Sequence, residues 1–219
     1  KIVHSSFETK HGHEEADTLM VHHVMTIASN SVIDVWSPDT DVFILLLDLV
    51  AHGRLGHGSK LYFVTGKGTK HMKIDIVERA HAYRLEKCKG LVGLHNFSGA
   101  DWGGKFVGIS KKSWINAYER LRNQDLALSF FVNLGEQLIP TQLENGALPA
   151  AAQPVEAFVC QLYSRHGPNT LPDLRWNLFQ TRNLEGEMLP PTRASLLPHI
   201  LRANFSAMVS KSYLTALPH

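Results

Sequence analysis

The amino-acid sequence predicts an α/β fold in its first part and a mainly α-helical region after it. Up to about residue 122, short runs rich in β-branched and aromatic residues alternate with segments whose apolar residues recur with helical spacing. From residue 123 onward, prolines recur and the helical segments become short. We therefore expect two parts, residues 1–122 and residues 123–219.

The composition excludes several classes of protein. Hydrophobic residues make up 44% and charged residues 19%, which is ordinary for a folded globular chain, and the net charge of +2 does not by itself indicate nucleic-acid binding. Asp48 interrupts the longest apolar run, residues 42–51, which is far below the roughly 20 residues of a membrane span. Cys88 and Cys160 are far apart and no signal pattern is present, so we expect a nuclear or cytoplasmic protein that is not secreted.

The first predicted elements are a helix, a strand and a second apolar segment. Apolar residues recur with helical period over residues 16–29, and acidic residues lie at the start of this segment, where the helix dipole favours them. Residues 32–36 predict a buried strand, which Ser37, Pro38 and Asp39 end with a turn. Residues 42–50 favour a buried helix, although periodicity alone leaves a strand open.

A hairpin and three helices follow in the prediction. Residues 61–64 and 71–74 flank a glycine-containing turn, which is typical of a β-hairpin, and helices are expected at about 75–85, 87–97 and 108–121. The hairpin lysines, Lys67, Lys70 and Lys73, could contact a nucleic-acid backbone. The alternative is an ordinary solvated face.

Three acidic clusters offer candidate metal ligands: Glu14 to Asp17, Asp39 with Asp41, and Asp101. Asp39 and Asp41 follow a predicted strand, and α/β sheets bind ligands beyond the carboxyl ends of their strands. Carboxylate oxygens are the ligands that Mg²⁺ or Mn²⁺ prefers, and two such ions could activate a water and stabilise a leaving oxygen. Taken singly, each cluster also fits a structural role as a helix cap or turn.

In their order, these clusters and the following Gly108-Ile109-Ser110-Lys111-Lys112 segment resemble the internal region of flap-endonuclease and XPG-type nucleases. The resemblance covers about residues 14–121. It implies a three-layer α/β/α PIN-like fold and a divalent-metal-dependent nuclease that hydrolyses phosphodiester bonds, in DNA more than in RNA. By matching positions, it implies two Mg²⁺ or Mn²⁺ ions held by catalytic carboxylates at Glu15, Asp17, Asp39, Asp41 and Asp101. It also implies a helix-turn-helix that contacts nucleic acid through Gly108, Lys111 and Lys112.

Three segments resemble a more specific group of multicopy, mobile-element-like animal proteins: residues 14–18, residues 37–43 and residues 195–204. The first strand of the nuclease family, with its own essential Asp, has no counterpart here, so we expect the module to be incomplete as given. The family usually has Gly-x-Gly-x-Lys in the turn, and Ser110 replaces the later glycine.

Several alternatives stay open. Side chains two apart on a regular helix point about 200° apart, so Glu15 pairs with Asp17 only if Glu15 precedes the helix; otherwise Glu14 and Asp17 would be the pair. His13 and Asp17, four apart, could hold a transition metal, but no His-Glu-x-x-His motif occurs. The chain could also be a catalytically inactive PIN-like module that binds nucleic acid or protein, or its working part could be the region from Asn123.

Overall fold

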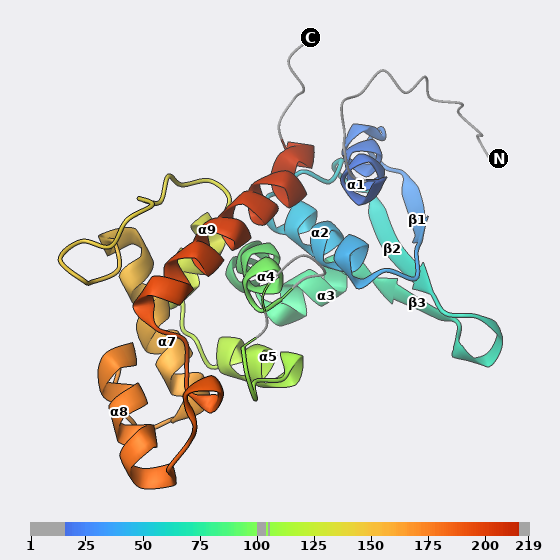
Figure 1. Ribbon diagram of the computed structural model, residues 1–219. Coiled ribbons are helices and arrows are strands. Elements are labelled where there is room, and N and C mark those ends of the chain that lie inside the picture. The colour runs from blue at the N-terminus through green and yellow to red at the C-terminus, as the bar shows by residue number, and fades with distance from the viewer. Residues whose placement is uncertain (1–15, 100–103, 105, 215–219) are drawn as a thin grey trace.

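The computed structural model describes residues 16–99, 104 and 106–214, and it has a mixed α/β architecture (Figure 1). A small sheet and its helices form the first part, and helices alone form the rest. Four short 3₁₀ turns occur among the described residues: η1 Gly68–Lys70, η2 Ala150–Ala152, η3 Gly186–Met188 and, directly after α9, η4 Lys211–Leu214. The helices and strands are α1 Ala16–Thr26, β1 Val32–Trp36, α2 Thr40–Ala51, β2 Lys60–Thr65, β3 Met72–Asp75, α3 Ile76–Tyr83, α4 Leu85–Phe97, α5 Lys111–Glu119, α6 Leu126–Asn133, α7 Gln153–Tyr163, α8 Leu171–Arg182 and α9 Arg193–Ser210.

The sheet has the strand order β1-β2-β3. β1 pairs in parallel with β2, with Val32 opposite Lys60 and Trp36 opposite Val64, and α2 forms the connection between them. β2 and β3 form the expected antiparallel hairpin. The α/β class, the hairpin and the helical character of the region after residue 123 are therefore confirmed, and residues 42–50 are helical.

The expectation that residues 32–36 form a fully buried strand is wrong. Only Ile33 and Val35 are buried, whereas Val32 and Trp36 are exposed. Successive side chains of a strand point to opposite faces, and the described helices cover one face of this sheet. The three-layer PIN-like arrangement, which needs helices on both faces, stays a prediction.

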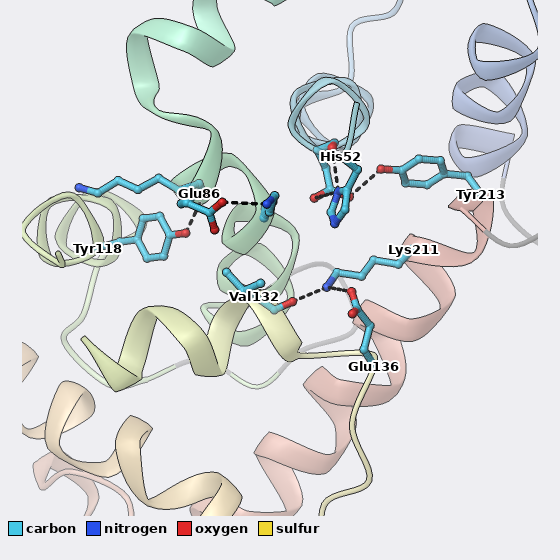
Figure 2. A network of polar contacts seen from close by, with 10 residues as sticks. His52, Glu86, Tyr118, Val132, Glu136, Lys211 and Tyr213 are labelled. Atoms are coloured by element: carbon cyan, nitrogen blue, oxygen red, sulfur yellow. Dashed lines mark hydrogen bonds and ion pairs between the residues drawn. The ribbon is translucent and has the colours of Figure 1, made fainter. Parts of the chain in front are cut away.

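The first apolar core lies between the inner face of the sheet and α1, α2, α3 and α4. Ile33, Val35, Leu61 and Phe63 from the strands pack with buried side chains of these helices. Tyr213 of η4 also belongs to this core, and its hydroxyl donates to the fully buried carboxylate of Asp48 at 2.6 Å (Figure 2). The end of α9 thereby returns to the first part of the fold.

The second core is aromatic and lies between α4, α5, α6, α7, α8 and α9. Phe97 makes edge contacts with Trp114 and Phe131 at centroid distances of 5.5 and 5.7 Å. Side chains of α4 contribute to both cores, so the two cores meet along this helix. A Cβ atom on Gly93 of α4 would lie 2.1 Å from the carbonyl oxygen of Phe131, which shows how closely α4 and α6 approach.

No helix among residues 16–99, 104 and 106–214 is both long and apolar enough to cross a membrane.

Candidate metal and nucleic-acid site

The candidate site begins where β1 ends. Ser37 continues the sheet by donating its backbone N–H to Val64 O at 3.1 Å, and the Ser37 hydroxyl accepts the N–H of Asp39 at 3.0 Å. Asp39 is the N-cap of α2, and its Oδ1 accepts the N–H of Asp41 at 3.0 Å. Asp39 and Asp41 thus lie together beyond the carboxyl end of β1, at the positively polarised start of a helix.

Asp41 is paired with a histidine that the sequence analysis did not single out. His95, in the last turn of α4, places Nε2 2.9 Å from Asp41 Oδ1. The hydrogen bond from His95 lowers the pKa of Asp41 below its ordinary value of 3.8, and the positive charge of Lys111 lowers it further. The carboxylate is therefore ionised at neutral pH while its side chain stays 44% exposed.

His95 has an unusual environment for a surface ion pair. Its Nδ1 is buried and has no hydrogen-bond partner among the described residues. The only sequence signal for His95 was its position just before the Ser98-Gly99-Ala100-Asp101 cluster. Its approach to Asp41 depends on the packing of α4 against α2, which a local pattern does not reveal.

Lys111 joins the ends of α4 and α5. Its Nζ donates to His95 O at 3.2 Å and to Gly99 O at 3.3 Å, and both carbonyls lie at the end of α4. Burial lowers the pKa of Lys111, and the charge of Asp41 opposes that shift. Lys111 therefore supplies positive charge near Asp41 and also fixes the corner between the two helices.

A turn at Gly108 precedes α5. Gly108 adopts a φ of +72°, a conformation that favours glycine. Ser110 then caps α5, with its hydroxyl accepting the N–H of Ser113 at 3.1 Å. Lys112 is exposed in the first turn of α5.

A groove of about 220 Å³ runs beside the Asp41–His95 pair, between α2, α3, α4 and α5. Its walls are mostly apolar, and Phe43, Ile44 and Leu47 of α2 form one of them. Lys111 and Arg79 supply positive charge to its lining, and Glu119 supplies a negative charge. The groove offers a ligand apolar contact close to an anionic and a cationic group.

The structure brings together only some of the predicted ligands. Asp17 lies half-buried in the first turn of α1, and Glu15 and Asp101 lie outside the described residues. Within the described part of the chain, no three His, Cys, Asp or Glu side chains form a group that could hold a metal ion. The five-carboxylate site therefore stays a prediction.

The donor types of Asp39 and Asp41 nevertheless fit a hard divalent cation. One oxygen of Asp39 accepts the Asp41 N–H, and one oxygen of Asp41 contacts His95. The second oxygen of each carboxylate is the kind of ligand that Mg²⁺ and Mn²⁺ bind. Asp39 and Asp41 are thus the described residues that would hold such an ion.

Comparison with known proteins adds no relative. No family model matches the chain, and neither the curated proteins nor the solved structures contain a match.

Proposed function

We propose that the chain is a divalent-metal-dependent nuclease module that hydrolyses phosphodiester bonds, in DNA in preference to RNA. The observation behind this proposal is the pair of acidic residues, Asp39 and Asp41, beyond the carboxyl end of β1, with Asp41 kept ionised by His95. Sites beyond strand ends are where α/β sheets bind ligands. The resemblance of the acidic clusters to flap-endonuclease and XPG-type nucleases supports the same function.

In this proposal the protein supplies positioning and charge. The carboxylates of Asp39 and Asp41 would hold Mg²⁺ or Mn²⁺ together with Glu15, Asp17 and Asp101. A bound divalent ion activates water and stabilises the leaving oxygen of a phosphodiester. Lys112, exposed in the first turn of α5, contacts the nucleic-acid backbone, and Lys111 adds positive charge beside Asp41.

A second candidate is a catalytically inactive module that binds nucleic acid or protein. It is favoured by the structural partners of both carboxylates. Asp39 caps α2, and Asp41 is paired with His95, so each residue has a role in the fold that needs no metal. Under this alternative, the acidic pair is retained for helix capping and packing.

Calorimetric titration with Mn²⁺ separates the two candidates. The variant is Asp39→Asn/Asp41→Asn, and the matched control is Glu185→Gln/Glu187→Gln, which removes two exposed carboxylates with the same spacing far from β1. The nuclease proposal expects binding to the wild type and the control, and none to the Asn variant. Equal binding, or no binding, in all three proteins would favour the inactive module.

Cleavage is tested in a longer protein, in which these residues are joined to the first part of the nuclease fold and which shows metal-dependent activity. Asp41→Asn in such a protein is expected to abolish metal-dependent cleavage, because the substitution removes a ligand oxygen and its charge. Unchanged cleavage by both the Asp39→Asn and the Asp41→Asn variants would contradict the assignment.

A further inference from the structure

The outer face of the sheet is a second surface with distinct chemistry. Alternate residues of β1 point away from the helices, and Val32 and Trp36 are 70% and 65% exposed. Strand pairing places Lys60 beside Val32, and Tyr62 beside Asp34, on this same face. In Figure 1 the helices of the first part lie on the other side of the strands.

Aromatic and cationic side chains lie next to each other on this face. The ring of Trp36 lies 5.5 Å from that of His71, and Lys73 Nζ lies 4.3 Å from the centre of the Tyr62 ring. Lys73 also forms a 2.8 Å ion pair with Asp34. The sheet thus presents an exposed Trp36 ring on β1 and, on β2, a Tyr62 ring that Lys73 of β3 covers.

More positive charge surrounds the rings than negative charge. Lys60 lies at the start of β2, and Lys67 and Lys70 lie in the exposed loop between β2 and β3. The acidic side chains on the face are already engaged, since Asp34 pairs with Lys73 and Asp75 caps α3 by accepting the N–H of Glu78 at 3.0 Å. On the face itself, the cationic side chains of Lys60, Lys67 and Lys70 therefore outnumber the acidic ones, and the nearest further acidic residues are Asp39 and Asp41 beyond the end of β1.

We propose that this outer face binds single-stranded nucleic acid. An unpaired base stacks on Trp36, and Lys60, Lys67 and Lys70 contact the backbone. Stacking on aromatic side chains within a positively charged surface is how proteins bind single strands without reading their sequence. A duplex does not offer its base faces, so the surface selects unpaired strands.

The charge distribution favours nucleic acid over a protein partner. The centre of a protein interface is depleted of charged residues. Here Asp34 of β1 and Lys73 of β3 form an ion pair that spans the face across β2, over the Tyr62 ring.

The position of the face links it to the acidic site. Trp36 is the last residue of β1, and Ser37 and Pro38 connect it to Asp39. A strand bound along β1 toward its carboxyl end would be delivered to Asp39 and Asp41. This delivery rests on the proposed nuclease function, whereas the binding itself rests on the outer face that no described helix covers.

The test is fluorescence anisotropy of a labelled dT oligonucleotide at low salt with EDTA present. Trp36→Ala is expected to weaken binding on the order of tenfold, because it removes one stacking surface. The control is Trp176→Ala, which removes another exposed tryptophan, 61% exposed on α8, and is expected to bind as the wild type does. The same oligonucleotide annealed to its complement is expected to bind more weakly.

The lysines are tested by salt dependence. Log affinity falls with log salt concentration, and each contact to a single-strand phosphate contributes about 0.7 to the steepness of that slope. Lys67→Ala/Lys70→Ala removes two contacts and is therefore expected to make the slope shallower by roughly 1.4. Arg120→Ala/Arg122→Ala, an exposed basic pair after α5, is the charge-matched control and is expected to leave the slope unchanged.

Two outcomes would overturn the proposal. One is oligonucleotide affinity that is absent in the wild type or equal in the wild type and Trp36→Ala. The other is a wild-type dimer that Trp36→Ala converts to a monomer in sedimentation, which would make the face an interface between copies of the chain. The Mn²⁺ titration is repeated on Trp36→Ala, where unchanged metal binding shows that failure here is separate from failure of the nuclease proposal.

Discussion

Asp39 and Asp41 each use one carboxylate oxygen within the fold: Asp39 caps α2, and Asp41 contacts His95. The second oxygen of each carboxylate is a candidate metal ligand. The Ser37-Pro38-Asp39 turn made their place at a strand end predictable, because proline and Asx residues end strands and cap helices. His95 was not predictable in the same way. Its contact with Asp41 joins two helices that are distant in sequence, and its ion pair depends on how α4 packs against α2.

The first prediction concerns the pKa of Asp41. His95→Leu is expected to raise that pKa toward 3.8, because the substitution removes the hydrogen bond that contributes most to lowering it. The measurement is an NMR titration of the Asp41 carboxyl group. His81→Leu, at an exposed histidine of α3, is the control and is expected to leave the Asp41 pKa unchanged.

The same shift determines a pH dependence of stability. The folded-state pKa of Asp41 lies below its ordinary value of 3.8, so its contribution is complete above that value and is lost as pH falls through the lowered pKa. His95→Leu is expected to reduce the loss of stability in that acidic range. Identical acid-denaturation curves for wild type and variant would contradict the proposed role of the ion pair.

At the scale of elements, sequence patterns predicted β1, the hairpin and most helices. They did so because the spacing of apolar residues reflects which side of a helix or strand packs against the core. They left residues 42–50 ambiguous, since α2 packs against α1, α3 and α4 and is apolar on several sides. The acidic residue Asp48 interrupts this apolar run and is nevertheless fully buried, where it accepts a hydrogen bond from Tyr213. The local sequence does not indicate this distant partner.

α4 is the element whose close packing is most open to test. Gly93→Ala would place a Cβ atom 2.1 Å from the Phe131 carbonyl oxygen, so α6 must shift. We expect the variant to lose about 1–3 kcal/mol of unfolding free energy, as overpacked sites do. Urea denaturation measures this loss, with Gly186→Ala as a control because no atom lies within 4 Å of its added Cβ. Equal unfolding free energies for the two variants would contradict this expectation, because they would mean that α6 can move away from α4 without a loss of stability.

At the scale of the whole molecule, the C-terminal helix ties the two parts together. Besides the Tyr213 contact, Lys211 is buried and its Nζ donates to Val132 O at 2.6 Å and to Glu136 Oε1 at 2.8 Å (Figure 2). The sequence predicted a first part and a helical second part. It did not predict that η4 inserts into the first core, because a contact over this sequence distance leaves no periodic signal.

The Tyr213 contact predicts a stability difference between two tyrosines. Tyr213→Phe leaves the buried Asp48 carboxylate without its 2.6 Å donor, and we expect a loss of about 1–3 kcal/mol. Tyr163→Phe is the control, because the Tyr163 hydroxyl is buried and has no partner among the described residues. Thermal or urea unfolding compares the two, and equal losses would contradict the role assigned to Tyr213.

The most direct measurement is of where Mn²⁺ binds. Amide NMR spectra recorded with substoichiometric Mn²⁺ are expected to lose the signals around Ser37 to Phe43 and His95 first, because the paramagnetic ion broadens its nearest neighbours. In Asp39→Asn/Asp41→Asn these signals are expected to persist. Broadening centred on other residues, or the same broadening in wild type and variant, would contradict a metal site at the carboxyl end of β1.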